Sequence, residues 1–83
     1  MKVYVFTTHA VADYDDYGIN NRVFANEQDA LNALKEWRDD EMYYVEDTGM
    51  TVGTDVANHF EAYLEGWYAQ YHTEGFVNEY EIE

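Results

Sequence analysis

The chain has 83 residues, 18 acidic and 4 basic, so its formal net charge at pH 7 is −14. Because 47% of the residues are hydrophobic and 18% are aromatic, we expect one folded acidic domain spanning residues 1–83. Cysteine and serine are absent, which excludes disulfides, thiolate and serine nucleophiles and zinc fingers. A pI near 4.1 has the wrong sign for direct nucleic-acid binding, because phosphate contacts need clustered lysine and arginine.

The first predicted strand covers residues 2–8, where β-branched and aromatic residues occupy both faces. Apolar groups on both faces predict a strand inside the sheet. A turn-rich segment over residues 13–18 follows, and a short strand over residues 21–25 is expected to complete a hairpin with a long loop. The apolar run at residues 3–6 is too short for a signal-peptide core or a membrane span, so we expect a cytoplasmic protein without a membrane partner.

A helix is predicted to begin after Asn26, a favourable N-cap residue, with Glu27 and Asp29 in its first turn. Apolar residues recur from there at helical spacing. The end of the helix stays open between residues 40 and 45, because Glu41 falls in line with the apolar stripe. The opposite face is expected to present Asp29, Asn32, Glu36, Asp39, Asp40 and Tyr43.

A second helix is predicted from a cap at Thr54 to about residue 72, after connections over residues 47–49 and 51–54. Its apolar stripe consists of Val56, Phe60, Tyr63, Leu64, Trp67 and Tyr71. Gly75 is then expected to break the chain, and residues 76–83 alternate as a last strand with an acidic outer face.

These elements predict a two-layer α+β fold of order β-β-α-α-β. In it, two helices cover one face of a three-stranded antiparallel or mixed sheet. The strand order stays open. The uncovered face of the sheet is expected to expose some of Tyr4, Phe6, Val77, Glu79 and Glu81.

Three segments carry a resemblance to known sequences: MKVYVFTT at residues 1–8, RVFANEQDA at residues 22–30 and YEIE at residues 80–83. This plan is similar to that of small uncharacterised proteins of bacteriophages and bacterial mobile elements. The resemblance covers these segments only and brings no catalytic residue with it. It implies a bacterial or phage origin, a cytoplasmic location and an action on a host protein.

One candidate metal site is Asp13, Asp15 and Asp16, followed by Gly18. Alternate carboxylates and a glycine resemble the start of a calcium-binding loop. The twelfth position of that loop is Phe24, where a bidentate glutamate is expected. The alternative interpretation is a solvated hairpin loop.

A second candidate is the pair Asp55 and His59, which are four residues apart and would stack on one side of the predicted helix. Such a pair can bind metal or act in acid–base chemistry, or it can be an ordinary pair on a helix surface. His72 is expected to point to another side. We therefore expect no cofactor and no enzymatic activity.

The aromatic and acidic residues indicate a binding surface. Nine tyrosines and two tryptophans are more than an 83-residue core can enclose, and these residue types are enriched at interfaces. The candidate aromatic contacts are Tyr14, Tyr17 and Tyr43, and the candidate charged contacts are Asp39, Asp40, Glu79 and Glu81.

The sequence thus favours a non-enzymatic interaction protein, such as an acidic inhibitor or DNA mimic that binds a basic nucleic-acid-binding protein. A structural homodimer that pairs through the open face of the sheet is one alternative. A calcium-responsive module is another. The acidic surface also has a simpler interpretation, as a solvated face that keeps a small protein in solution.

Overall fold

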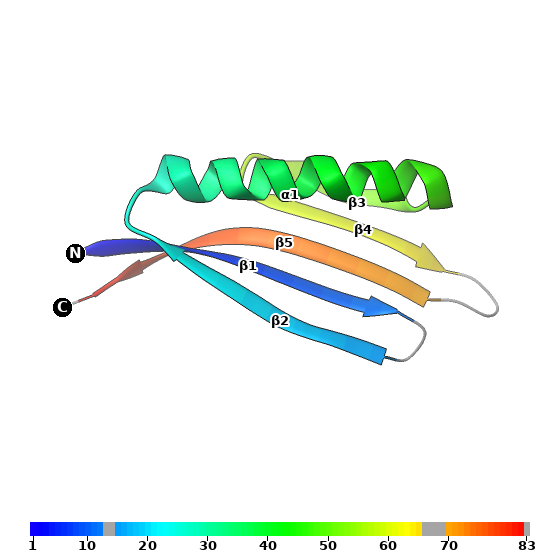
Figure 1. Cartoon of the computed structure of the whole chain (residues 1–83), viewed down its shortest axis with the longest axis horizontal. Coiled ribbons are helices and arrows are strands. Elements are labelled where there is room, and N and C mark those ends of the chain that lie inside the picture. Colours follow the sequence, from blue (N-terminus) through cyan, green and yellow to red (C-terminus); the bar gives the residue numbers. More distant parts are fainter. Residues whose placement is uncertain (13–14, 66–69, 83) are drawn as a thin grey trace.

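The computed structural model describes the backbone of residues 1–12, 15–65 and 70–82, and the side chains of these residues except 12, 15–17, 65 and 70. Within them the elements are β1 (Lys2–Ala12), β2 (Asp15–Phe24), α1 (Glu27–Thr48), β3 (Thr51–Val56), β4 (His59–Glu65) and β5 (Gln70–Glu81). The strands form one antiparallel sheet of order β2-β1-β5-β4-β3, and α1 covers one face (Figure 1). The radius of gyration, 13.8 Å, exceeds the roughly 12 Å of a compact chain of this length, so the molecule is elongated.

The α+β class and the two layers are confirmed, but the predicted three strands and two helices are wrong. The segment predicted as a second helix forms the β3–β4 hairpin and the start of β5. In β4, Phe60 and Ala62 are buried on the helix side, whereas His59 and Glu61 lie on the other face. This alternation overrides the helical spacing that the same residues also show. Trp67 of the predicted stripe lies outside the described residues.

The predicted long loop between the first two strands is also wrong. β1 continues to Ala12 and β2 begins at Asp15, so both strands are longer than expected. The register shifts between His9 and Val11, which leaves an extra residue in β2. Gly18 in this bulge has φ of 86°, a left-handed conformation that glycine adopts without steric cost. β1 pairs with β2 and β5, which confirms its predicted place inside the sheet.

Helix α1 begins where the sequence predicts. The Asn26 side chain accepts hydrogen bonds from the backbone N–H of Gln28 (2.8 Å) and of Asp29 (3.3 Å). The helix does not end near residue 40 but continues to Thr48, so residues 47 and 48, which were predicted as part of a connection, are helical. Gly49 ends it with φ of 77°, and its N–H donates to the carbonyl of Val45 (3.0 Å).

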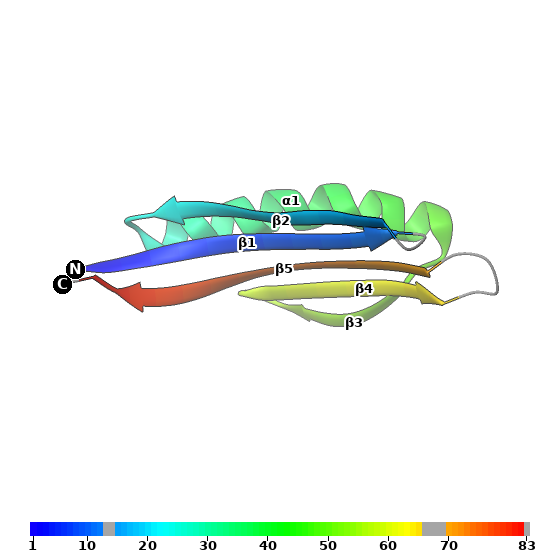
Figure 2. The ribbon, with the colours of Figure 1, turned by 90° about the horizontal axis from the view of Figure 1, so that it is seen from below.

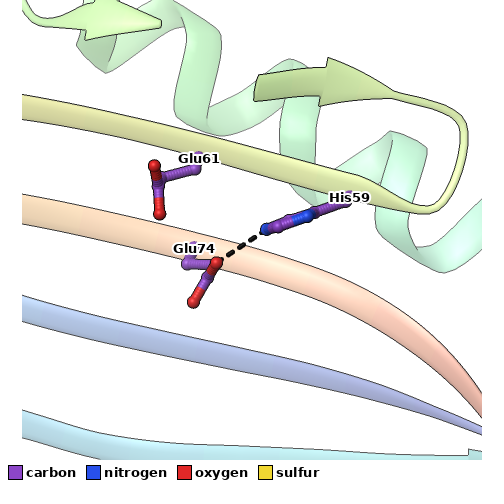
Figure 3. A group of neighbouring side chains, drawn as sticks. All are labelled: His59, Glu61 and Glu74. Atoms are coloured by element: carbon purple, nitrogen blue, oxygen red, sulfur yellow. Dashed lines mark hydrogen bonds and ion pairs between the residues drawn. The ribbon is translucent and has the colours of Figure 1, made fainter. Parts of the chain in front are cut away.

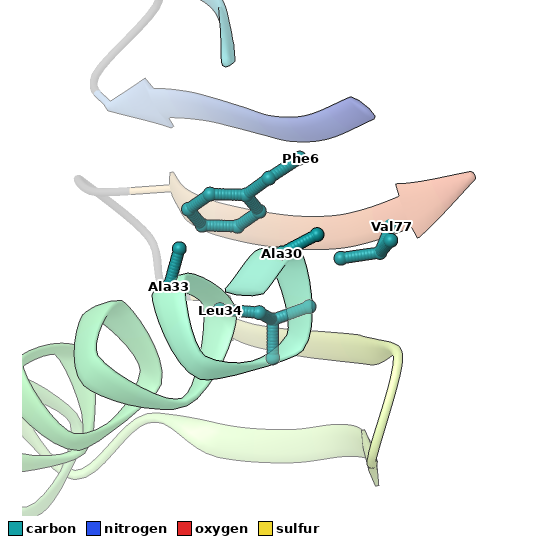
Figure 4. Packing of buried hydrophobic residues seen from close by; sticks show 5 residues of the cluster. All are labelled: Phe6, Ala30, Ala33, Leu34 and Val77. Atoms are coloured by element: carbon teal, nitrogen blue, oxygen red, sulfur yellow. The ribbon is translucent and has the colours of Figure 1, made fainter. Parts of the chain in front are cut away.

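The core lies between α1 and the sheet in two clusters. The first consists of Phe6, Ala30, Ala33, Leu34 and Val77, in which two alanines let the helix backbone approach the strands (Figure 4). The second consists of Val45, Met50, Phe60 and Ala62. Phe6 and Val77 therefore face the helix, with Tyr4 packed against the same cluster, which corrects their predicted place on the open face. Glu79 and Glu81 follow Val77 at the same alternate positions of β5, so they too lie on the helix side.

Trp37 joins the two clusters. Its ring meets Phe6 and Phe60 edge-on, at centroid distances of 6.0 and 5.8 Å. Beneath it lies Gly75 of β5, where an added Cβ would stand 2.8 Å from Cε3 of the indole. The prediction that Gly75 breaks the chain is wrong. This residue lies inside the 12-residue strand β5, where its missing side chain makes room for the tryptophan.

An ion pair fastens α1 to the edge strand β3. The guanidinium of Arg38 binds both carboxylate oxygens of Asp55, through Nε at 3.0 Å and through Nη2, and it also contacts Asp39 at 3.2 Å. The hydrogen bond from Arg38 holds the pKa of Asp55 below its ordinary value, against a smaller effect of burial. This two-point contact fixes the position of the helix over β3 and β4.

Candidate functional site

The helix α1 leaves the other face of the sheet uncovered (Figure 2). The strand register places all three histidines of the chain on this open face. His9 lies on β1, His59 on β4 and His72 on β5. In the strand register, Glu74 stands between His9 on one side and Glu61 on the other. Because directly paired residues share a face, the topology gathers these titratable groups in the middle of the sheet. We call His59, Glu61, His72 and Glu74 the His–Glu cluster.

The cluster is built from two copies of a His-x-Glu pattern. His59 and Glu61 come from β4, and His72 and Glu74 come from β5. Since the strands run antiparallel, the pairs bond across the gap: Nε2 of His59 lies 2.6 Å from Oε2 of Glu74, and Nε2 of His72 lies 3.1 Å from Oε2 of Glu61. Each glutamate therefore contacts a histidine of the opposite strand.

The cluster places two like charges directly opposite each other. Glu61 and Glu74 are paired residues of β4 and β5, an arrangement that is destabilising for two carboxylates. Their side chains are only 30% and 24% exposed, so water screens the repulsion incompletely. A positive charge between them, on imidazolium or on a metal ion, would offset it.

Three ligand atoms of the cluster converge. The ring nitrogen of His59 and one carboxylate oxygen each of Glu61 and Glu74 all lie within 4.8 Å of one another (Figure 3). Imidazole nitrogen and carboxylate oxygen are ligands of divalent transition metals.

The opposite side of the molecule is strongly acidic. Seven carboxylates of α1 are exposed, against the two bases Lys35 and Arg38. We call the following residues the acidic helix face: Asp29, Glu36, Asp39, Asp40, Glu46 and Asp47. Tyr43 protrudes among them with 83% of its surface exposed. The predicted polar face of this helix is thus confirmed and extends to its last turn.

A cavity of about 310 Å³ lies at the inner side of α1. Glu41 enters it, which explains how an acid fits in line with the apolar stripe. Burial raises the pKa of this carboxyl and the neighbouring Asp40 raises it further, against a hydrogen bond with Thr73 that lowers it. The full lining is Ala10, Val11, Glu41, Tyr44, Met50, Tyr71, His72 and Thr73.

The structure divides the predicted charged contacts between two elements. Asp39 and Asp40 lie beside Tyr43 on α1. Glu79 and Glu81 lie near the end of β5, where they pair with Lys2 (3.0 Å) and with the N-terminal amine (3.5 Å). Asp39 is partly neutralised as well, by Arg38 at 3.2 Å, so Asp40 is the one of these four acids that has no ion pair among the described residues.

The other predicted contacts and the predicted calcium site involve residues whose side chains the structure does not describe. Asp13 and Tyr14 lie outside the described residues. Asp15, Asp16 and Tyr17 have a described backbone in β2, but their side chains lie outside the description. The calcium-binding loop and these aromatic contacts stay predictions.

The predicted pairing of Asp55 with His59 is wrong. The two residues flank the turn of the β3–β4 hairpin, where Asp55 pairs with Phe60 on the helix side and His59 lies on the open face. His72, which was expected to point elsewhere, shares the face of His59. Sequence reasoning missed the His–Glu cluster, although the repeated His-x-Glu pattern would have indicated it once both segments were assigned as strands.

Comparisons with protein-family models, with curated proteins and with solved structures found no match for this chain. Among the described residues, no helix has the length and apolar character needed to cross a membrane. Two surfaces of the molecule are candidates for function: the acidic helix face and the open face with its His–Glu cluster.

Proposed function

We propose that this chain is a non-enzymatic interaction protein that binds a basic, nucleic-acid-binding protein through the acidic helix face. The observation that carries the proposal is the row of exposed carboxylates along the whole of α1. A helix of 22 residues is about 33 Å long, so its seven exposed acids, which are Glu27 and the six of the acidic helix face, average one negative charge per roughly 5 Å. One strand of DNA carries a charge about every 3.4 Å, so the spacing is closer to a single phosphate row than to a duplex.

Two further features support this surface as a contact. Tyr43 adds a nearly fully exposed aromatic ring among the acids, and tyrosine is enriched at binding hot spots. The net charge of −14 steers a basic partner toward the molecule and repels a second copy of it. The resemblance to phage and mobile-element proteins fits an action on a host protein in the cytoplasm.

The test is a pull-down from nuclease-treated bacterial lysate with two matched variants. Glu36→Gln/Asp40→Asn removes two charges of the acidic helix face that have no ion pair among the described residues, and Glu79→Gln/Glu81→Gln removes two charges that are already paired. We expect the wild-type chain to retain a basic protein at low salt and release it at roughly 0.5 M salt, where the Debye length is only a few ångströms. The helix variant should lose this protein and the β5 variant should keep it.

The recovered protein must then lose its own nucleic acid when the wild-type chain is added. Equal retention by both variants, or a partner that still binds its nucleic acid in the complex, would contradict the proposal. Recovery of no basic protein at low salt would contradict it for that lysate.

A second candidate function, self-association through the open face, is favoured by exposed apolar residues there. Ile19, Val23, Val56 and Tyr80 are between 51% and 66% exposed. The predicted contacts Tyr4 and Phe6 play no part, because they face the helix. Salt separates the two functions: screening weakens binding of a basic partner but favours pairing of two acidic copies. A mass measured by light scattering that doubles at high salt, and stays single in Val23→Lys, would support the dimer.

A further inference from the structure

We propose that His59, Glu61 and Glu74 form a site for a divalent transition-metal ion, with Zn²⁺ as the reference metal. The three ligand atoms lie within 4.8 Å of one another. Zn²⁺ bonds of about 2.0–2.2 Å bring donors in a tetrahedral shell to roughly 3.5 Å apart. His59 Nε2 and Glu74 Oε2, which are 2.6 Å apart in a hydrogen bond, must separate by somewhat less than about 1 Å while Glu61 approaches them, and rotations of the two glutamate side chains can provide both movements.

The backbone holds these ligands in place before any ion binds. β4 and β5 each have a partner on both sides, so all three ligands stand on interior strands of the sheet. Glu61 and Glu74 are direct partners in the register, and His59 precedes Glu61 by two residues on the same face. Sites built on regular strands keep their geometry better than sites built on loops. The open face leaves the remaining coordination position to water or to an external ligand.

The two facing carboxylates favour binding of a divalent cation, because one protonation would neutralise only one of their two charges. Two opposed carboxylates in a chain of net charge −14 repel each other, and a divalent ion neutralises both at once. The second histidine supports the arrangement from outside the set, because its Nε2 lies 3.1 Å from Glu61 Oε2. Such outer hydrogen bonds orient carboxylate ligands in metal sites.

The imidazole decides the class of metal. Ca²⁺ and Mg²⁺ prefer shells made of oxygen alone, whereas a nitrogen donor with carboxylates suits Zn²⁺ and other first-row transition metals. This site uses other residues than the predicted calcium-binding loop of Asp13, Asp15 and Asp16, whose side chains offer oxygen ligands only. It is also independent of the acidic helix face, on the other side of the molecule.

The test is calorimetric titration of the full chain, freed of metal with a chelator, with ZnCl₂ and then with MgCl₂ at equal ionic strength. We expect one equivalent of Zn²⁺ to bind, and the Glu74→Gln variant to bind it more than about 100-fold more weakly, exceeding the loss from an outer contact. The control is Glu46→Gln, which removes one exposed carboxylate from the acidic helix face and should leave Zn²⁺ affinity unchanged. Circular dichroism confirms that both variants are folded.

Two spectroscopic measurements report the ligands directly. Zn²⁺ should shift the ring-proton resonances of His59 in NMR spectra, and Co²⁺ should give visible absorption bands that Glu74→Gln abolishes. The proposal is overturned if Mg²⁺ competes with Zn²⁺ at similar concentration, because the ion would then sit in a general acidic atmosphere. It is equally overturned if Glu46→Gln weakens binding as much as Glu74→Gln, or if wild type binds no Zn²⁺.

Discussion

The contact between Trp37 and Gly75 carries much of the packing in this small protein. The indole lies over the backbone of β5 with Phe6 on one side and Phe60 on the other, and it touches both core clusters. Any side chain at position 75 would occupy the space of the ring, because an added Cβ would stand less than 3 Å from three of its carbons. The position of the helix over the sheet therefore depends on a missing side chain.

We predict that Gly75→Ala destabilises the fold by about 1–3 kcal/mol, the usual cost of overpacking a core. Chemical denaturation of wild type and variant measures the change in the free energy of unfolding. The control is the same substitution in a Trp37→Leu background, where the smaller side chain leaves room for a methyl group. The cost of Gly75→Ala should shrink there, and an undiminished cost would show that strand conformation, not the indole, causes it.

Glu41 lies where the pattern of α1 calls for an apolar residue, and its pKa is raised by burial and by Asp40. A carboxyl with a raised pKa in the folded state binds its proton more tightly there than in the unfolded chain. Its contribution to stability is thus greatest in acid and is lost as the pH rises through the raised pKa. At neutral pH the ionised form destabilises the fold.

We predict that Glu41→Gln raises the melting temperature at pH 7, because the amide keeps a partner for Thr73 and carries no charge. The gain should vanish at about pH 3, where a carboxyl is protonated in both states. Thermal melts of both proteins at the two pH values provide the measurement. An equal gain at both pH values would point to packing instead of charge.

At the scale of elements, the sequence predicts the start and the polar face of α1 well, but its end and the following strands poorly. The cap at Asn26 and the polar face of the helix are local features, visible in a single turn of chain. Residues 59–65 fit helical and alternating spacing equally, and the choice is made by pairing with β3 and β5, which are distant contacts. The spacing of apolar residues along one segment carries no information on such pairing with distant strands.

The same ambiguity hid the candidate metal site. His59 and His72 lie on one face only when both segments are strands, so an incorrect helix placed them on different sides. The acidic helix face could be predicted, because it needs one element alone. To predict a site whose residues come from two strands, one needs the register in which the strands pair, and the sequence alone does not reveal this register.

The last turn of α1 opposes the helix dipole. Glu46 and Asp47 lie at the negative end of the helix, and no basic residue lies in that turn. Carboxylates there interact unfavourably with the unpaired carbonyl groups. The acidic helix face thus extends to a position where it costs stability.

We predict that Asp47→Lys stabilises the fold by about 0.3–1 kcal/mol, the typical size of a charge–dipole effect at a helix end. Asp29→Lys is the matched control, since it changes the net charge equally but acts at the positive end of the dipole. Urea denaturation at low ionic strength should show a clearly smaller gain, or a loss, for the control. Equal gains in both variants would assign the effect to net charge alone.

For the whole molecule, charge and apolar surface are divided between two sides. Exposed acids line the helix, whereas the open face has Glu61 and Glu74 as its acids among the described side chains, each bonded to a histidine. The elongated shape, 48 × 22 × 16 Å, limits the buried core and spreads the charge. Repulsion among the acids therefore lowers the free energy of unfolding of a protein whose small core contributes only modest stability.

We predict that NaCl raises the melting temperature between about 0.02 and 0.5 M, because the Debye length falls below the spacing of most surface charges. The triple variant Glu36→Gln/Asp39→Asn/Asp40→Asn should start higher at low salt and gain less. Calorimetry or circular dichroism melts test this. A melting temperature that does not change with salt would show that repulsion on this surface is negligible.

The place of β5 in the sheet determines how much of the fold can form while the ribosome is still synthesising the chain. β5 is the last of the six elements to be made, yet it is the strand that joins the β1–β2 hairpin to the β3–β4 hairpin. Until residues 70–81 emerge, the two hairpins share no backbone hydrogen bonds, and Trp37 has no strand beneath it. Pairing Lys2 with Glu81 closes nearly the whole described chain, a contact of very long range that slows folding. The apolar faces of α1 and of the two hairpins therefore stay partly exposed until β5 has been synthesised. Aggregation of the nascent chain is favoured most during this interval.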